Sequence, residues 1–311
     1  MAVTPLVSVL IPCFNAEAWV AETLDSVLAQ SWPSLEIIVV DDGSTDRSAA
    51  IIADYADRGV TLIRQTNQGT SAARNRAFAA SSGDFIQHLD ADDVLDPEKI
   101  ERQVARLADA SDCVCTGEAG CFVGAPEDTL FRPLATWLDL DPLDWLARNF
   151  EPCMIIPIIW LVPRALALEV GPWVESIVAC NDREYFTRLV LASRRVLFAS
   201  GARCRYRVGN PRSLSQHMAW SSTFETLDRC EAQVRAREDS ERVRRVFAID
   251  WQDLAHAAYP YDAILAERAL DRARDLHSFT IGPGGGPKFR LASLLLGWRA
   301  ARRLQVMCGG R

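Results

Sequence analysis

The sequence predicts an α/β fold: a Rossmann-like, mostly parallel sheet flanked by helices, followed by a helical C-terminal extension. Strand and helix signals alternate with short connections over roughly the first hundred residues, the pattern of a parallel sheet covered by helices. Residues 7–11 form a continuous apolar run, as a strand buried on both faces requires. Residues 221–276 are helical in character, with mixed charges on the exposed faces.

The first half of the chain divides into four strand–helix units. After the strand at 7–11, apolar residues at Val20, Leu24 and Val27 recur with helical spacing, and Asn15 is the expected N-cap. The other expected elements are strands at 36–40, 60–63 and 85–89, and helices at 46–55, at 70–80 with Thr70 as cap, and after Asp96 and Pro97.

Beyond residue 112 the pattern loosens. Residues 130–165 are rich in Trp, Leu and Pro, and we expect them to form a covering subdomain rather than another βαβ unit. A helix capped by Asn181 and a short strand at 196–198 are expected next, and the run 282–287 of Gly and Pro is a clear break. We therefore expect a domain of residues 1–220, in two halves (1–110 and 111–220), and a helical region at 221–311.

Composition excludes several classes of protein. The formal charge of −7 and a pI of about 5.3 argue against broad nucleic-acid binding, which needs a basic surface. The nine cysteines are scattered through apolar runs, which favours buried free thiols, and no Cys-x-x-Cys pair or His completes a zinc set around Cys113, Cys115 and Cys121. Because no secretory signal pattern precedes the first strand, we expect a cytoplasmic protein.

Acidic residues mark three places along the chain: Asp41–Asp42 after the second strand, 90–93 after the fourth, and Asp182 at a helix start. Each alone is explained by a turn or a helix N-terminus. Together, however, they fall at the carboxyl edge of one predicted sheet, where open α/β sheets bind ligands. Asp90 and Asp92 put two carboxylates on a tight turn, which suits a hard divalent cation, although a solvated turn has the same pattern.

Four ordered motifs span about ninety residues. They are VSVLIPCFN at 7–15, EIIVVDDGSTD at 36–46, NQG with ARN at 67–69 and 73–75, and LDADD at 89–93. In this combination and order they resemble the family 2 glycosyltransferases of the GT-A fold. The resemblance implies that residues 1–110 bind a nucleotide and residues 111–220 bind the acceptor.

The resemblance also implies a set of nucleotide-binding residues. Pro12 and Phe14 would line the base pocket, with Phe14 in place of the more usual tyrosine, and Asp42 would accept a hydrogen bond from the base. Arg74 would approach the nucleotide from its helix. The full implied set is Pro12, Phe14, Asn15, Asp42, Arg74, Asp90 and Ala91. A core aromatic at Phe14 and a helix-surface ion pair at Arg74 remain open as alternatives.

A divalent cation, Mg²⁺ or Mn²⁺, follows from the same resemblance. Asp92 would be its principal protein ligand, Asp93 would share that role, and Asp90 would bind the ribose or help the metal. In the family's loop over the donor diphosphate, Arg207 would stabilise phosphate charge and His217 would reach the metal.

The acceptor half of family members usually carries a Glu-Asp pair whose aspartate is the catalytic base. Here Asp182 holds the matching position, while Asn181 replaces the glutamate. A single ionised carboxylate suffices to take a proton from an attacking hydroxyl. The alternative is that Asp182 only favours the positive end of a helix, with Asn181 and Glu184 resembling a capping box.

These motifs predict an inverting, metal-dependent transferase that moves a sugar from a nucleotide diphosphate sugar, by analogy a UDP-sugar, to a hydroxyl acceptor. The resemblance implies a saccharide or lipid-linked acceptor in polysaccharide or glycolipid synthesis. A non-catalytic nucleotide-sugar-binding module is the alternative, prompted by Asn181. Residues 288–303 combine leucines with arginines, which suits either a helix on the cytoplasmic face of an anionic membrane or a domain-packing helix.

Overall fold

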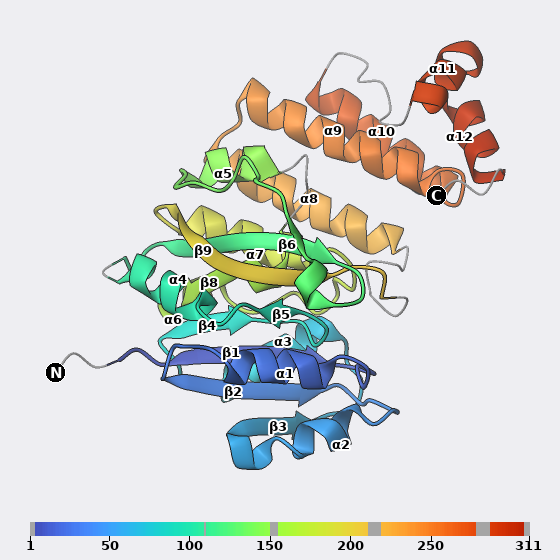
Figure 1. The fold of residues 1–311 in the computed structure, drawn as a ribbon. Coiled ribbons are helices and arrows are strands. Elements are labelled where there is room, and N and C mark those ends of the chain that lie inside the picture. The colour runs from blue at the N-terminus through green and yellow to red at the C-terminus, as the bar shows by residue number, and fades with distance from the viewer. Residues whose placement is uncertain (1–3, 109, 150–154, 211–218, 278–286, 308–311) are drawn as a thin grey trace. The chain divides into compact units, whose positions relative to one another are not determined.

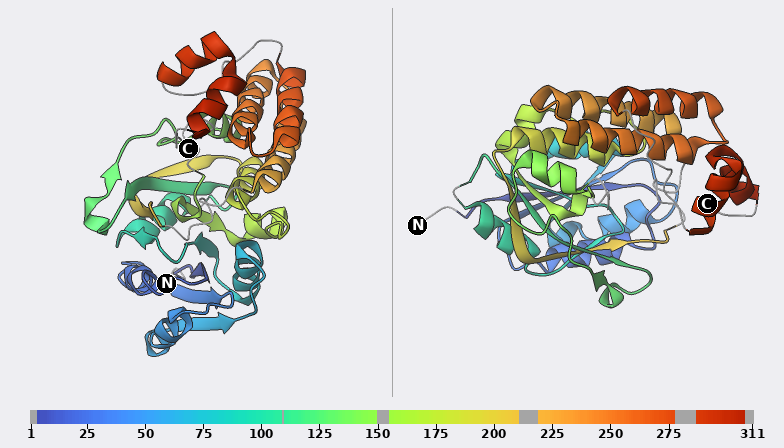
Figure 2. Two further views of the ribbon diagram at one scale, coloured as in Figure 1. Left: turned by 90° about the vertical axis from the view of Figure 1, so that its right-hand side faces the viewer. Right: turned by 90° about the horizontal axis from the view of Figure 1, so that it is seen from above.

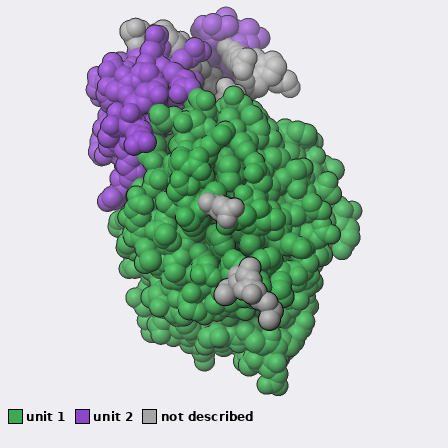
Figure 3. All heavy atoms as spheres, turned by 90° about the vertical axis from the view of Figure 1, so that its left-hand side faces the viewer, with its two compact units in different colours: residues 1–216 green, residues 217–311 purple. Residues whose placement is uncertain are grey.

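The computed structural model describes residues 4–108, 110–149, 155–210, 219–277 and 287–307. The chain divides into two compact units, residues 1–216 and 217–311, which are coloured separately in Figure 3. The first unit holds the sheet and the helices that flank it, and the second is helical throughout its described part (Figure 1).

The first unit alternates strands and helices, as its sequence pattern predicts. Its parallel part consists of β1 (Val7–Cys13), α1 (Val20–Leu28), β2 (Leu35–Asp41), α2 (Ser48–Ala53), η1 (Ala56–Arg58), β3 (Val60–Arg64), α3 (Thr70–Ala80) and β4 (Phe85–His88). The later part consists of β5 (Val94–Leu95), α4 (Lys99–Leu107), β6 (Val114–Phe122), η2 (Pro126–Asp128), β7 (Leu130–Phe131), α5 (Pro142–Asn149), η3 (Pro157–Ile159), β8 (Trp160–Pro163), α6 (Arg164–Val170), α7 (Asn181–Ala192) and β9 (Val196–Arg207).

The strands form one mixed sheet. In the described residues the order is β3-β2-β1-β4-β8-β6-β9-β5, with β7 paired to β6. Strands β1 to β4 pair in parallel, β6 and β9 also pair in parallel, and β8 runs antiparallel to both β4 and β6. Every residue of β1 is buried, as its unbroken apolar run requires for a strand covered on both faces.

Several expected details differ in the structure. Asn15 does not cap α1, because its φ of 50° and its hydrogen bond to the Thr45 amide turn it toward the next loop, and Trp19 precedes the helix instead. Helix α2 is shorter than the expected 46–55, and α4 begins at Lys99 rather than directly after Pro97. Thr70 and Asn181 are the first helical residues of α3 and α7 rather than their caps.

Two expectations for the second half of the sheet were also wrong. Residues 130–165 were expected to cover the domain, but β8 lies inside the sheet between β4 and β6. The strand expected at 196–198 extends to Arg207, because β9 pairs with β6 at 196–198 and, after an irregularity in register, again at 203–207. This extension brings the end of β9 to the turn that follows β4.

The second unit is built from α8 (Trp220–Arg237), α9 (Glu241–Ala258), α10 (Ala263–Leu276), α11 (Pro287–Leu296) and α12 (Trp298–Met307). Helices α9 and α10 lie side by side in both views of Figure 2. Buried Glu231 joins three helices, because it accepts hydrogen bonds from the Trp251 indole at 2.7 Å and from Arg272 at 2.8 Å. In the described part of the chain, no helix is both long and apolar enough to span a bilayer.

Candidate active site

The carboxyl ends of β2, β1 and β4 meet at one edge of the sheet. Cys13 at the end of β1 is in register with Asp41 at the end of β2, and Leu10 is in register with His88 at the end of β4. The segments that follow these strands are therefore neighbours. This is the position at which parallel α/β sheets form ligand crevices.

Asp42 organises the loop that follows β3. Its buried carboxylate accepts hydrogen bonds from the Gln65 side chain at 2.7 Å and from the backbone amides of Gln68 and Gly69, both at 2.9 Å. Gly69 has a φ of 91°, a conformation that side chains other than glycine rarely adopt. A carboxylate accepts about four hydrogen bonds, so Asp42 retains capacity for one more donor.

Three residues at the end of β1 have different environments: Pro12, Phe14 and Asn15. The Phe14 side chain is 50% exposed, so its ring is accessible to a planar ligand. The Asn15 side-chain oxygen accepts a hydrogen bond from the Thr45 amide at 2.8 Å, which connects the β1 and β2 ends. Pro12 is a buried member of β1.

The turn at 90–93 gathers three carboxylates after β4, with Ala91 buried between them. One oxygen of Asp92 accepts a hydrogen bond from the Asn210 side chain at 2.7 Å. One oxygen of Asp93 accepts from the Arg207 amide at 2.9 Å, and the other is buried with no hydrogen-bond partner in the described residues. Burial, and then neighbouring carboxylates, raise the pKa of both Asp92 and Asp93.

This turn fits a hard divalent cation. Its oxygen donors are the type that Mg²⁺ and Mn²⁺ prefer, and the unpartnered oxygen of Asp93 and the raised pKa values show that nearby positive charge would be favourable. Within the described ranges no group of three or more His, Cys, Asp or Glu side chains is placed to hold a metal ion. A cation here would therefore need ligand oxygens from outside these side chains, such as those of a diphosphate.

Arg207 fastens the turn at 90–93 to its surroundings. Its guanidinium donates to the backbone oxygens of Asp92 and Gly124, both at 2.9 Å, pairs with Glu22, and lies 4.4 Å from the centre of the Phe122 ring. Its side chain is thus engaged by protein groups, and contact with a diphosphate stays a prediction. His217, the other residue expected near the diphosphate, lies outside the described residues.

Arg74 is buried and connects the two halves of the site. Its guanidinium pairs with Asp90 at 2.7 Å, donates to the Asn181 side chain at 3.4 Å, and lies 4.3 Å from the centre of the Trp173 ring. The alternative that Arg74 forms only an ion pair on the helix surface is therefore wrong, because its side chain is buried. The contacts instead support a role in holding Asp90 and the start of α7 together.

Asp182 lies half-buried in the first turn of α7, and one of its oxygens accepts a hydrogen bond from the Arg183 amide at 2.8 Å. Burial raises the pKa of this carboxyl to about 6, although the charge of Arg74 acts in the opposite direction. An acid with this pKa is ionised at neutral pH and is a stronger base than an ordinary aspartate. The position suits proton abstraction.

Tyr206, near the end of β9, is subject to the charges of acidic residues from both halves. Burial and then the charges of four carboxylates raise the pKa of its hydroxyl; these belong to Asp93, Asp90, Asp92 and Asp182. Contacts of Arg74 with Asp90 and with Asn181 place the turn at 90–93 and the start of α7 in one region.

Three residues near the site were not assigned roles from the sequence: Trp173, Tyr206 and Asn210. Trp173 stacks on Tyr185 at 4.0 Å between ring centres and supports Arg74. Trp173 and Tyr206 could have been noticed in the sequence as aromatic residues close to the predicted site residues. No local sequence signal pairs Asn210 with Asp92, which lies 118 positions away.

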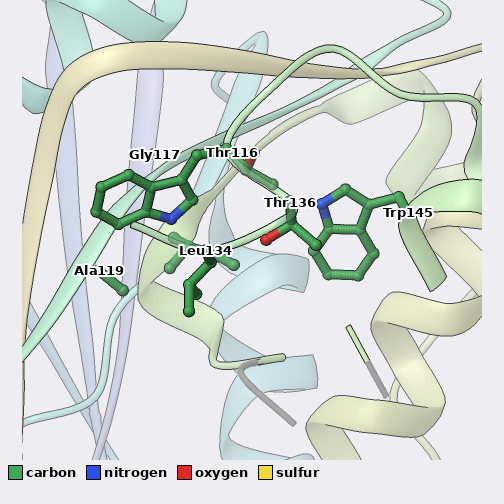
Figure 4. Close-up of a pocket in the computed structure, with 8 residues that line it drawn as sticks. Thr116, Gly117, Ala119, Leu134, Thr136 and Trp145 are labelled. Atoms are coloured by element: carbon green, nitrogen blue, oxygen red, sulfur yellow. The ribbon is translucent and has the colours of Figure 1, made fainter. Parts of the chain in front are cut away.

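A separate, small hollow lies between β6 and the segment before α5 (Figure 4). Figure 4 shows Thr136 and Trp145 facing Thr116 across it. None of its eight lining residues is ionisable, so this hollow offers no catalytic acid or base.

Comparison with known proteins identifies the family. The sequence model described as glycosyl transferase family 2 matches residues 8–169, just over half of the chain. The chain belongs to glycosyl transferase family 2. This confirms the resemblance carried by the four motifs.

Matches to individual relatives extend over only part of each relative's length. The putative glycosyltransferase EpsH of Bacillus subtilis is 38% identical over 128 residues, which are 40% of this chain and 36% of EpsH. The putative teichuronic acid biosynthesis glycosyltransferase TuaG, also of Bacillus subtilis, is 37% identical over 110 residues, 34% of this chain and 44% of TuaG. The match thus spans less than half of either relative.

Solved structures confirm the GT-A-type fold over nearly the whole chain. S. aureus TarS 1–349 in complex with UDP-GlcNAc has a TM-score of 0.69 at 17% identity, covering 98% of this chain and 92% of that one. The mannosyltransferase PcManGT from Pyrobaculum calidifontis, in complex with GDP-Man and Mn²⁺, has a TM-score of 0.54 at 16% identity, covering 100% and 89%. At these identities the likeness concerns the fold alone.

Proposed function

We propose that this member of family 2 is an inverting glycosyltransferase that moves a sugar from a nucleotide diphosphate sugar to a hydroxyl acceptor. The observation that supports it best is the bridge made by Arg74, which pairs with Asp90 of the turn at 90–93 and donates to Asn181, the neighbour of Asp182 in the first turn of α7. A general base and a diphosphate-binding turn must be close together if both are to act on one glycosidic bond.

Asp182 is the general base in this proposal. Above about pH 6 its carboxylate is ionised and accepts the proton of the acceptor hydroxyl. The hydroxyl oxygen attacks the anomeric carbon on the face opposite the diphosphate, and the bond to the diphosphate oxygen breaks. One displacement inverts the configuration of that carbon.

Asp92 is the principal residue that would hold a divalent cation, with Asp93 and Asp90 beside it and His217 as a further proposed ligand. When bound, the cation would stabilise the negative charge that accumulates on the diphosphate as the bond to the sugar breaks. Asn210 orients the Asp92 carboxylate through its 2.7 Å hydrogen bond. Arg207 holds the backbone of the same turn, which keeps the carboxylates at the sheet edge.

The nucleotide would bind where β1 and β2 end. The exposed Phe14 ring offers a stacking face for the base, and Asp42 retains an acceptor position for a base N–H group. Pro12, Asn15 and Ala91 complete the proposed nucleotide-binding set. Uridine is the proposed base because TarS, a structural neighbour over nearly all of the chain, is described in complexes with UDP and with UDP-GlcNAc.

The proposed acceptor is a saccharide or lipid-linked hydroxyl in polysaccharide or glycolipid synthesis. The name of TuaG, a relative over about a third of this chain, refers to teichuronic acid, a polysaccharide. Buried free thiols at Cys13, Cys115 and Cys204 favour a reducing compartment, and we propose the cytoplasm.

Metal-dependent donor binding tests the donor half of this proposal. We expect UDP-GlcNAc with Mn²⁺ to raise the melting temperature of the wild-type protein, since a ligand that binds only the folded state stabilises it. Asp92→Asn should abolish the Mn²⁺-dependent part of the shift. Asp128→Asn, an exposed aspartate of η2 outside the turn at 90–93, is the matched control and should behave like wild type. An unchanged shift in Asp92→Asn would count against Asp92 as the metal ligand.

A non-catalytic nucleotide-sugar-binding module is the second candidate, because Asn181 stands where relatives carry a glutamate. Such a module would show the same Mn²⁺-dependent shift but no transfer from any UDP-sugar to a hydroxyl acceptor. Donor binding is therefore expected for both candidates. Asp182→Asn separates them, because it should lower sugar transfer only if the protein is an enzyme.

A further inference from the structure

The last two helices expose a concentrated set of apolar side chains. On α11, Leu291, Leu294 and Leu295 follow the i, i+3, i+4 spacing that places residues on one helix face, and Leu294 is 84% exposed and Leu295 75%. On α12, Leu304 and Met307 are spaced three apart and Met307 is 81% exposed. Exposed apolar residues gathered in this way indicate an interaction surface.

Opposite faces of the same helices already pack within the second unit. Phe289 of α11 lies 4.9 Å from the His256 ring, and Trp298 of α12 lies 5.4 Å from the Tyr259 ring. Ala301 of α12 is also buried. The helix pair is therefore anchored on α9 and its following turn by one set of residues. The leucines are a second set that this packing leaves exposed to solvent.

The charge of this segment is opposite to that of the rest of the chain. Residues 276–311 contain six Lys and Arg and no Asp or Glu, whereas the preceding 275 residues contain 28 Lys and Arg against 41 Asp and Glu. By helical spacing, the exposed Arg303 lies on the same face of α12 as Leu304 and Met307. Arg299 of α12 pairs with Glu267 and Arg302 is buried, so Arg303 is the exposed arginine in the described part of α12. An apolar face with a basic residue beside it is complementary to anionic lipid headgroups over an acyl layer.

We propose that α11 and α12 form a docking surface for an anionic membrane, with the exposed leucines inserted at the headgroup boundary and the basic residues near lipid phosphates. A second copy of this chain is a poorer occupant, because it would bring together two segments that each carry Lys and Arg but no Asp or Glu. The surface lies in the second unit and acts independently of the catalytic chemistry proposed for the first.

Vesicle binding by the full-length protein tests this surface. We expect co-sedimentation with phosphatidylcholine vesicles that contain phosphatidylglycerol, weakened as salt is raised from about 50 mM to about 500 mM because counterions screen the headgroup charge. Leu294→Gln combined with Leu295→Gln should weaken binding at least about tenfold, since the side chains that enter the membrane are replaced by polar ones. Both positions are exposed, so the melting temperature should not change.

The matched control replaces exposed apolar residues of the same unit outside the acid-free segment. Ile264→Gln combined with Tyr261→Gln, at positions 78% and 60% exposed, should leave vesicle binding unchanged. Absence of wild-type binding, equal binding to pure phosphatidylcholine, or equal binding by the Leu294/Leu295 variant would overturn the proposal. So would a lipid-free dimer, seen by sedimentation velocity, that the Leu294/Leu295 variant dissociates, because a second copy would then cover the face.

Discussion

The two halves of the sheet place their functional residues by different means. In the parallel half, Asp42 and the turn at 90–93 directly follow β2 and β4, so strand order alone brings them together. In the second half β8 runs antiparallel between β4 and β6, and Asp182 comes from a helix start rather than a strand end. There, long-range side-chain contacts determine the position of the proposed base.

Arg74 is the clearest case of this difference. It belongs to the parallel half by sequence, yet its guanidinium contacts Asp90 in one half and Asn181 in the other, 107 positions away. The ring of Trp173 lies against the same guanidinium. The proposed donor and acceptor parts of the site are thus connected by the buried guanidinium of Arg74, and changes in the second half should act through it.

The largest expected effect is that of Asp182→Asn. An amide cannot accept the hydroxyl proton, so we expect transfer to fall by about a thousandfold, the scale of general base catalysis. UDP-GlcNAc binding should be retained, because the proposed nucleotide-binding residues lie in the parallel half. Initial rates of sugar transfer and the thermal shift with UDP-GlcNAc measure the two quantities, and Asp128→Asn is the control. If Asp182→Asn lost donor binding and sugar transfer equally, donor binding and proton abstraction would not be separate functions of the two halves of the sheet.

Arg74→Met should lower the free energy of unfolding by about 2 kcal/mol, because it leaves Asp90 without its buried partner. Asp90 is partly exposed, so the loss should be smaller than that from breaking a fully buried ion pair. Urea denaturation measures it. Arg76→Met, an exposed position on the same helix, should change stability by less than about 0.5 kcal/mol. Similar losses in both variants would contradict the bridging role of Arg74.

The pH profile should show the raised pKa of Asp182. Burial raises this pKa to about 6, so the carboxylate is the active form above that value and is protonated below it. We therefore expect kcat/KM to be level above about pH 7 and to fall about tenfold per pH unit below about pH 6. A profile that stays level down to about pH 4.5 would indicate a base with the ordinary aspartate pKa of about 3.9.

Asn181→Glu should give the smallest effect and test the departure from the family pattern. A carboxylate at this position would pair with Arg74 and add negative charge beside Asp182, which disfavours ionisation of Asp182. The midpoint of the pH profile should rise, by less than about one unit. Asn181→Ala serves as the control for loss of the amide alone, and a downward shift in Asn181→Glu would refute the electrostatic argument.

The sequence by itself determined the parallel half and the family. Largely apolar strands, glycine-containing turns and the acids that follow the second and fourth strands predict β1 to β4 and place Asp42 and Asp92 at one edge, because parallel strands end on the same side. The four motifs at 7–15, 36–46, 67–75 and 89–93 together sufficed to identify the family, since each lies within a single short segment.

Only the tertiary structure decided how the second half completes the site. It placed β8 inside the sheet, showed Arg74 buried against Trp173, and gave Arg207 protein partners at Asp92 and Gly124. Helical periodicity shows which face of a helix is apolar, but it does not show which distant segment that face meets. A buried arginine or aspartate takes its role from partners more than a hundred positions away, and those partners are chosen by packing.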